Sequence, residues 1–345
     1  MLPVQSAQGW ACRSWPAAKY MGLVLSSCMA WMGADSAPAR QEPPAPVPEE
    51  LRPYVNARSV VNQPPAELVK LYPELKDVEF ARSQEELSLL LKRVGEGVEA
   101  FFRDFVNTAS TESINQEVEI PRLIRQPLAP VGQHMGMHQV APQPVHHKCN
   151  YLIVAQREED GIALEEYRTD SKGERTNLAS FFLLTSGFAA EPILFHPRYQ
   201  AGSLFRYLGR EVKGHRLQVL AFAQRPEKPE LVGHLYLTAL PALLLNQGMV
   251  WIDPDSYQIV RMRTDMLAPR YDVLLERLTS EIELAEVHFD RAPRPFWLPH
   301  KVTVTVEWQH TIYRTRHSYS DYKLFSVETR EDKKEIVSPP RQIPQ

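Results

Sequence analysis

Lys301-Val302-Thr303-Val304-Thr305-Val306-Glu307-Trp308 alternates apolar and polar residues without a break. Successive side chains of a β-strand point to opposite faces of the sheet. The three valines and Trp308 therefore share one face, and the charged and hydroxyl side chains share the other. This pattern predicts a strand with one face on a core and the other toward solvent.

Segments of the same β-rich character recur along most of the chain. We expect strands at 114–120, 151–157, 163–170, 204–212, 216–224, 231–236, 249–253, 257–265, 274–290 and 298–325, the last long enough for two. The joints 158–161, 213–215 and 253–256 are short, and short joints force antiparallel pairing. Segment 216–224 is apolar on both faces, so we expect it to be covered on both. The sequence predicts an α+β fold with a large curved antiparallel β-sheet, a half-barrel of about nine to eleven strands.

One amphipathic helix precedes this sheet. Apolar residues recur at spacings of three and four from Leu87 to Phe105, which places them on one helical face. Ser83 and Glu86 stand three residues apart, the spacing of a capping box. We therefore predict a helix over 83–106 that covers the concave face of the half-barrel.

The ends of the chain have a different composition. Residues 1–37 combine two early basic residues, a short apolar stretch and small residues, which is typical of an export signal. A Pro-rich linker over 38–64, a single domain over 65–328 and a disordered polar tail over 329–345 complete the expected organisation. Leu25-Ser26-Ser27-Cys28 resembles the lipobox of bacterial lipoproteins, which leaves open whether Cys28 carries a lipid anchor.

The composition excludes some partners. Hydrophobic residues make up 43% of the chain and charged residues 23%, which are ordinary globular values, and the formal net charge is -3. A nucleic-acid surface is normally strongly basic, so we expect no nucleic-acid partner.

Motifs for catalysis are missing from the sequence. It contains no Gly-x-Ser-x-Gly elbow, His-Glu-x-x-His helix, Walker loop or Gly-x-Gly-x-x-Gly turn. Glu165 and Glu166 are neighbours on a predicted strand, so their carboxylates point to opposite faces and cannot share a site. We expect them on a solvated strand edge, with Arg168 paired across the strands. The sequence therefore predicts no enzyme, no catalytic residue and no cofactor.

A histidine-rich stretch is a possible metal site. Two methionines lie between His134 and His138. Further along, His146 and His147 precede Cys149. Imidazole and sulfur ligands suit copper. The stretch contains Pro and Gly and has no periodicity, so an exposed loop is the alternative interpretation.

Two apolar runs do not alternate as strands do. One is the aromatic-rich run of Phe181, Phe182, Leu183, Leu184, Phe188 and Phe195, and the other covers residues 240–245. We expect them to cross or plug the open side of the sheet. An apolar cavity for an acyl chain is one interpretation, and an ordinary packed core is the other. If a cavity exists, the residues expected to line it are Phe101, Phe105, Phe182, Leu184, Leu244, Trp251, Val304 and Trp308.

The hairpin Gly248-Met249-Val250-Trp251-Ile252-Asp253, followed by Ile259-Val260-Arg261-Met262, resembles a motif of the bacterial outer-membrane lipoprotein-sorting carriers of the Lol type. The resemblance covers residues 110–328. It implies a half-barrel whose apolar cavity shields lipid chains in transit through the periplasm.

Three hypotheses for function follow. One is a periplasmic or envelope-associated binding protein of a Gram-negative bacterium that holds a lipid, an acyl chain or a lipoprotein. Another is a structural or interaction module of the cell envelope, with an envelope protein as its partner and a barrel filled by its own side chains. Copper binding by the histidine loop is a third.

Overall fold

A computed structural model describes residues 49–120, 142–158, 161–174, 185–236 and 241–325. The export signal, Cys28, the first part of the Pro-rich linker and the polar tail lie outside the described residues. Within the described ranges, no helix combines the length and the apolar character that crossing a membrane would require.

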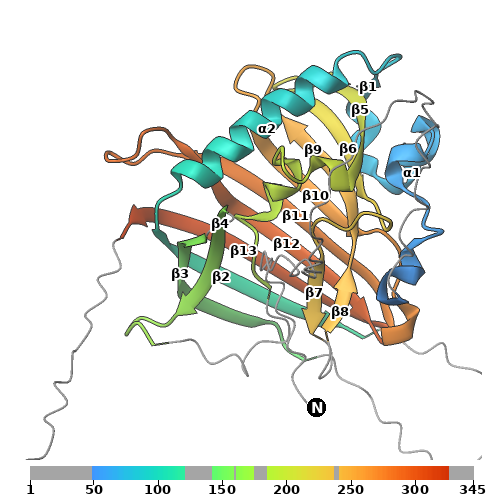
Figure 1. Ribbon diagram of the computed structural model, residues 1–345. Helices are drawn as coiled ribbons and strands as arrows, with labels where there is room; N and C mark the ends of the chain where they lie inside the picture. Colours follow the sequence, from blue (N-terminus) through green and yellow to red (C-terminus); the bar gives the residue numbers. More distant parts are fainter. Residues whose placement is uncertain (1–48, 121–141, 159–160, 175–184, 237–240, 326–345) are drawn as a thin grey trace, which may run out of the picture.

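Short helices and long strands make up the described chain (Figure 1). The helical elements are η1 (Glu49–Tyr54), η2 (Val60–Asn62), α1 (Pro65–Leu71), η3 (Pro73–Asp77), α2 (Leu87–Asp104), η5 (Glu191–Phe195), η6 (Gln200–Gly202) and η7 (Tyr271–Val273). The strands are β1 (Val78–Phe80), β2 (Thr108–Glu119), β3 (Val145–Glu158), β4 (Gly161–Thr169), β5 (Ser203–Glu211), β6 (Gln218–Gln224), β7 (Gly233–Tyr236), β8 (Pro241–Leu244), β9 (Asn246–Ile252), β10 (Ile259–Met266), β11 (Leu275–Val287), β12 (Phe296–Trp308) and β13 (Thr311–Leu324).

Eleven strands pair in one open antiparallel sheet of order β1-β5-β6-β9-β10-β11-β12-β13-β2-β3-β4. This confirms the expected large antiparallel sheet, and the three predicted short joints do connect neighbouring strands. Strands β1 and β8 were not predicted, and β8 pairs only with β7 in a separate two-stranded sheet. The chain leaves β4 at one edge and reaches β5 near the other, so the connection must cross the sheet.

The alternation of β12 is confirmed. Val302, Val304 and Val306 are buried together in one hydrophobic cluster, and Trp308 packs against that cluster. The indole of Trp308 donates a hydrogen bond to the carbonyl of Val273, 3.0 Å away. We call the face that these valines occupy the inner face of the sheet, and the opposite side the outer face.

Both faces of β6 and β9 are covered, as expected for segment 216–224. Leu220 and Phe222 pack in the inner cluster, while Val219 and Ala221 pack on the outer face. The outer cover consists of residues 49–78, which include Leu51, Tyr54 and Val60. These residues fall in the expected linker, but the Val60 amide donates to Gln247 Oε1 at 2.8 Å and the segment is packed on the sheet. The packed region therefore includes residues 49–64 as well.

Helix α2 runs across the sheet in Figure 1, and its apolar side belongs to the inner cluster. The ring of Phe101 lies 5.9 Å from that of Phe296 on β12. The helix begins at Leu87 rather than residue 83, and Glu86 makes no capping hydrogen bond with its side chain. The capping-box prediction is wrong because the Glu86 side chain pairs with Arg210 of β5 instead of capping the helix. The neighbouring Gln84 side chain also binds β5, through the backbone of Tyr207.

Two glycines permit close approach of backbones. A Cβ on Gly95 of α2 would lie 2.7 Å from Gln200 Nε2 and 3.2 Å from the carbonyl oxygen of Phe195. A Cβ on Gly248 of β9 would lie 1.9 Å from the carbonyl oxygen of Arg263 on β10. Gly248 opens the hairpin motif, and its missing side chain lets β9 and β10 pair at this point.

Candidate functional site

The inner face of the sheet has an apolar half and a polar half. The apolar half is formed by β6, β9, β10, β11 and β12. On β2, by contrast, four of the inward positions carry polar side chains that are buried. These are Thr108, Ser110, Glu112 and Gln116. A buried polar group needs a partner, and Glu112 and Gln116 have theirs on the neighbouring strand β13.

Glu112 is the centre of the polar half. Strand register places Tyr319 of β13 and Cys149 of β3 directly opposite it on its two sides. Glu112 Oε1 accepts hydrogen bonds from the Tyr319 hydroxyl and from His317 Nδ1, both at 2.8 Å. The Cys149 Sγ lies 3.4 Å from Oε2.

Arg168 supplies the positive charge for this carboxylate. It stands on β4 and reaches over Tyr151 of β3, with its guanidinium carbon 5.5 Å from the ring centroid. Its Nε lies 2.6 Å from Glu112 Oε2 and its Nη2 lies 2.8 Å from Oε1, a bidentate pair. Glu112, Arg168, His317, Tyr319 and Cys149 together form what we call the polar cluster.

Burial and charge determine the protonation states in the polar cluster. Burial by itself would raise the pKa of Glu112, but Arg168 and the His317 hydrogen bond outweigh it and hold this pKa far below its usual range. Burial lowers the pKa of His317, so its imidazole is neutral at neutral pH. The ionised Glu112 carboxylate can only accept a hydrogen bond from His317 Nδ1, so the imidazole proton lies on Nδ1. His317 Nε2 then accepts a hydrogen bond from the Thr185 hydroxyl at 3.2 Å.

A short segment over the sheet closes the polar half. We call residues 185–195 the strap, because they belong to the connection that crosses from β4 to β5. Glu166 of β4 accepts hydrogen bonds from the backbone amides of Gly187 at 2.5 Å and Ala189 at 3.1 Å. Within the strap, Glu191 accepts from the Ser280 hydroxyl of β11 at 2.9 and 3.2 Å.

The strap also contributes apolar side chains to the inner cluster. Its buried apolar residues are Phe188, Ala189, Ala190, Ile193, Leu194 and Phe195. The Phe195 ring lies 5.5 Å from the rings of both Phe205 and Phe222. The strap and α2 thus lie on the same apolar surface of the sheet.

The polar cluster has the chemistry of a structural anchor. Burial, followed by the charge of Glu112, raises the pKa of the Cys149 thiol to about 12, so the thiol is protonated and is a poor nucleophile. Glu112, His317 and Tyr319 are all buried, and their polar atoms are engaged with one another. The arrangement ties β2, β4, β13 and the strap together.

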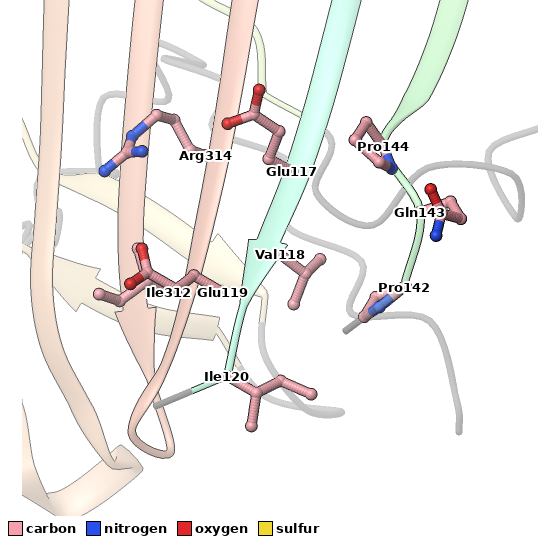
Figure 2. A pocket seen from close by; sticks show the side chains of 9 residues that line it. All are labelled: Glu117, Val118, Glu119, Ile120, Pro142, Gln143, Pro144, Ile312 and Arg314. Atoms are coloured by element: carbon pink, nitrogen blue, oxygen red, sulfur yellow. The ribbon is translucent and has the colours of Figure 1, made fainter. Parts of the chain in front are cut away.

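Two hollows border the described residues. One lies beneath α2 between Phe101, Pro192 and Trp297 and has a volume of about 30 Å³, room for roughly one or two water molecules. The other is an open groove of about 410 Å³ at the ends of β2, β3 and β13 (Figure 2). In Figure 2 the side chains of Val118 and Ile120 extend toward Pro142 and Pro144, while Arg314 lies on the far side of β2.

The structure brings together several of the residues expected to line a cavity. Phe105, Leu244 and Val304 are buried in the inner cluster, and Phe101 and Trp308 pack against it. Phe182 and Leu184 lie outside the described residues. Trp251 instead belongs to the outer cluster, where the Arg261 guanidinium lies 3.7 Å from its ring centroid.

The candidate metal ligands are only partly described. His134 and His138 lie outside the described residues. His146 and His147 are successive residues of β3, so their side chains point to opposite faces. Over the ranges that the structure describes, no three His, Cys, Asp or Glu side chains gather as a metal site would require.

Sequence reasoning missed the polar cluster. It placed Arg168 on a solvated edge, which is wrong: Arg168 is buried and its partner is Glu112, two strands away. The sequence did contain a signal for this cluster. Ser110 and Glu112 alternate in step with Ile114, and all three occupy inward positions of β2. Such a strand lacks an apolar face, and its first half was therefore not recognised.

Comparison with known proteins gives likenesses of structure only. No family model matches the sequence, and no curated protein matches it. The structure is similar to that of an outer membrane lipoprotein-sorting protein domain from Vibrio parahaemolyticus, with 11% identity and a TM-score of 0.33, over 68% of this chain and 91% of that one. It is also similar to a DUF1329 family protein from Desulfovibrio piger, with 10% identity and a TM-score of 0.32, over 68% and 90%.

Proposed function

We propose that this protein is a non-catalytic binding protein of the bacterial cell envelope that holds an acyl chain of a lipid or lipoprotein on the apolar half of its inner face. The observation that carries the proposal is the nature of the cover over that half. Among the described residues it consists of one helix, α2, the short strap and the small two-stranded sheet of β7 and β8, rather than a second large sheet. Displacement of α2 and the strap would expose a largely apolar surface that spans five strands and contains the hydroxyls of Thr264 and Ser280.

The location and the partner follow from the same proposal. The predicted export signal directs the chain out of the cytoplasm. An acyl chain needs protection from water during transit, and an apolar surface under a removable cover offers it. The polar cluster sits at one side of this surface as a rigid anchor, with no reactive group that faces an open site.

Acyl binding requires that the cover moves. The hollow beneath α2 is about 30 Å³, whereas ligand pockets usually measure about 300–1,000 Å³. The bound chain would replace strap side chains such as Phe188 and Phe195, which now fill the apolar surface. The exchange of one apolar contact for another costs little compared with the exposure of either to water.

Native mass spectrometry of the full chain, purified from a Gram-negative host, tests the proposal. We expect an adduct with the mass of a phospholipid or fatty acid. Photoreactive acyl chains in phosphatidylcholine vesicles should then crosslink to inner-face residues such as Val304 and Ile282. Thr303 and Thr305, on the outer face of the same strand, are the matched control positions. Absence of any adduct, or equal labelling of both faces, would exclude acyl binding at the inner face.

The small volume of the hollow beneath α2 favours a second candidate function. A module whose inner face is filled by its own strap and helix needs no ligand, and it would serve as a structural or interaction part of the envelope. For that function we expect no lipid adduct and no crosslink. Pull-down from an envelope fraction, with the full chain as bait, should instead recover a protein partner.

A further inference from the structure

Several polar contacts that hold the strap involve a side chain that can gain or lose a proton. Thr185 bonds His317, the amides of Gly187 and Ala189 bond Glu166, and Glu191 bonds Ser280. The strap's apolar side chains pack in the inner cluster. A change in protonation therefore acts directly on the contacts that hold the strap.

Glu191 differs from Glu112 in its surroundings. Glu112 has a bidentate arginine, whereas the groups that face Glu191 are the hydroxyls of Thr264 on β10 and Ser280 on β11 and the carboxyl group of Glu166 on β4. From α2, Glu99 interacts with His196 just beyond the strap, and from β13, His317 is bonded to Thr185 and Glu112. Glu191 is 4% exposed. A buried carboxylate without a nearby cation is strongly disfavoured.

The protonation of Glu191 reflects this environment. Burial raises its pKa to about 7, the hydroxyls of Thr264 and Ser280 lower it in part, and the charge of Glu166 raises it further. In water a glutamate has the ordinary value of 4.5. The docked strap therefore favours the neutral acid, and the released strap favours the carboxylate.

We propose that the strap is a releasable cover of the inner face and that loss of the proton from Glu191 releases it. The proposal rests on the proposed function, since the exposed face is the one that would receive the acyl chain. Ionisation places a charge between Thr264, Ser280 and Glu166, and release moves that charge into water. The docked strap is then stable in mild acid and loosens as the pH rises through neutrality.

Hydrogen exchange of the full chain, corrected for the intrinsic effect of pH, measures this release. Between about pH 5.5 and about pH 8, the difference between pKa values of about 7 and 4.5 reduces the docking equilibrium roughly 30-fold. The amides of Gly187, Ala189, Ala190 and Ile193 should lose protection by that factor. Amides of β11 and β12 should not change, because their strands stay paired.

Glu191→Gln keeps the shape and cannot ionise, so its strap should stay protected at both pH values. Glu227→Gln, at an exposed position, is the control and should behave as the wild type. Ser280→Ala removes a hydrogen bond that favours the carboxylate and should move the release midpoint to higher pH. Protection of the strap that is the same at both pH values in the wild type, or a loss in Glu191→Gln equal to that of the wild type, would overturn the proposal.

Crosslinking separates this proposal from the proposed function. Phosphatidylcholine with a photoreactive acyl chain keeps its headgroup charge over this pH range. A strap that opens without inner-face crosslinks leaves the release correct and the acyl-binding function wrong. Inner-face crosslinks with a strap equally protected at both pH values leave the function correct and the release wrong.

Discussion

Arg168 and Glu112 form a buried bidentate ion pair although 56 residues separate them in the chain. The pair spans from β4 to β2 across β3, and both side chains are nearly inaccessible to water. Its strength comes from two short charge-assisted hydrogen bonds, and the bonds from His317 and Tyr319 satisfy the same carboxylate. Loss of one partner leaves the other charged and buried.

Arg168→Met should destabilise the fold by about 3–5 kcal/mol, because it leaves the Glu112 carboxylate without its cation. Urea denaturation monitored by fluorescence measures the change. Arg316→Met is the matched control, since Arg316 pairs with Glu117 at the surface and should cost less than about 1 kcal/mol. Equal losses in the two variants would show that the buried pair contributes no more than the exposed one.

His317→Gln should change how stability depends on pH. The pKa of His317 is lowered in the fold, so the contribution of His317 to stability is fully present above the ordinary value of 6.5 and is lost as the pH falls below it. Glu191 has the opposite sign: its contribution is fully present below 4.5 and is lost as the pH rises to about 7. The two slopes oppose each other between pH 5 and 6.5.

Without His317, stability should rise as the pH falls from about 6.5 to about 5, by at most about 1.4 kcal/mol per pH unit from Glu191. Urea midpoints across this range give the slope. Glu191→Gln should show the reverse sign, a loss of stability on acidification. Parallel pH profiles for the wild type and both variants would contradict these assignments.

Two glycines of α2 should respond differently to the same substitution. Gly97→Ala meets only the end of the Gln258 side chain, at 3.2 Å, so the gain in helix propensity should stabilise the protein by about 0.5–1 kcal/mol. Gly95→Ala would push into Gln200, whose Nε2 bonds the carbonyls of Leu91 and Phe195. It should lose about 1 kcal/mol despite the same gain in propensity. Thermal denaturation compares the pair, and a stabilised Gly95→Ala variant would show that the helix does not need this close approach.

Leu274 stands in a left-handed backbone conformation with φ +57° and a side chain that is 53% exposed. Leu274→Gly should therefore raise stability by about 0.5–1 kcal/mol, since the strain of a Cβ in this region exceeds the entropy cost of glycine. Leu89→Gly is the control: Leu89 is 55% exposed within α2 and should lose about 1 kcal/mol. A loss at both positions would mean that the Leu274 side chain makes a contact worth more than the backbone strain.

The strands could be predicted from the sequence because the alternation of apolar and polar residues is a local pattern. In β12 each valine alternates with a polar residue. In the turn between β9 and β10, Asp253 accepts a hydrogen bond from the Ser256 amide at 2.8 Å. Such signals need only the few residues on either side. They predicted the long strands, their antiparallel sense and the double burial of β6, but not the three-residue β1, which carries too few residues for a pattern.

The sequence by itself determined the strands, their hairpins and the apolar stripe of α2. Only the tertiary structure decided what lies on the inner face. Gln116 and Thr315 meet across 199 residues, and this pairing of β2 with β13 brings Glu112 beside His317 and Tyr319. The strap is held by Glu166 and Ser280, from strands on opposite sides of β12 and β13. Alternation shows which residues share a face of one strand, but the neighbours of that strand depend on the energies of the whole sheet.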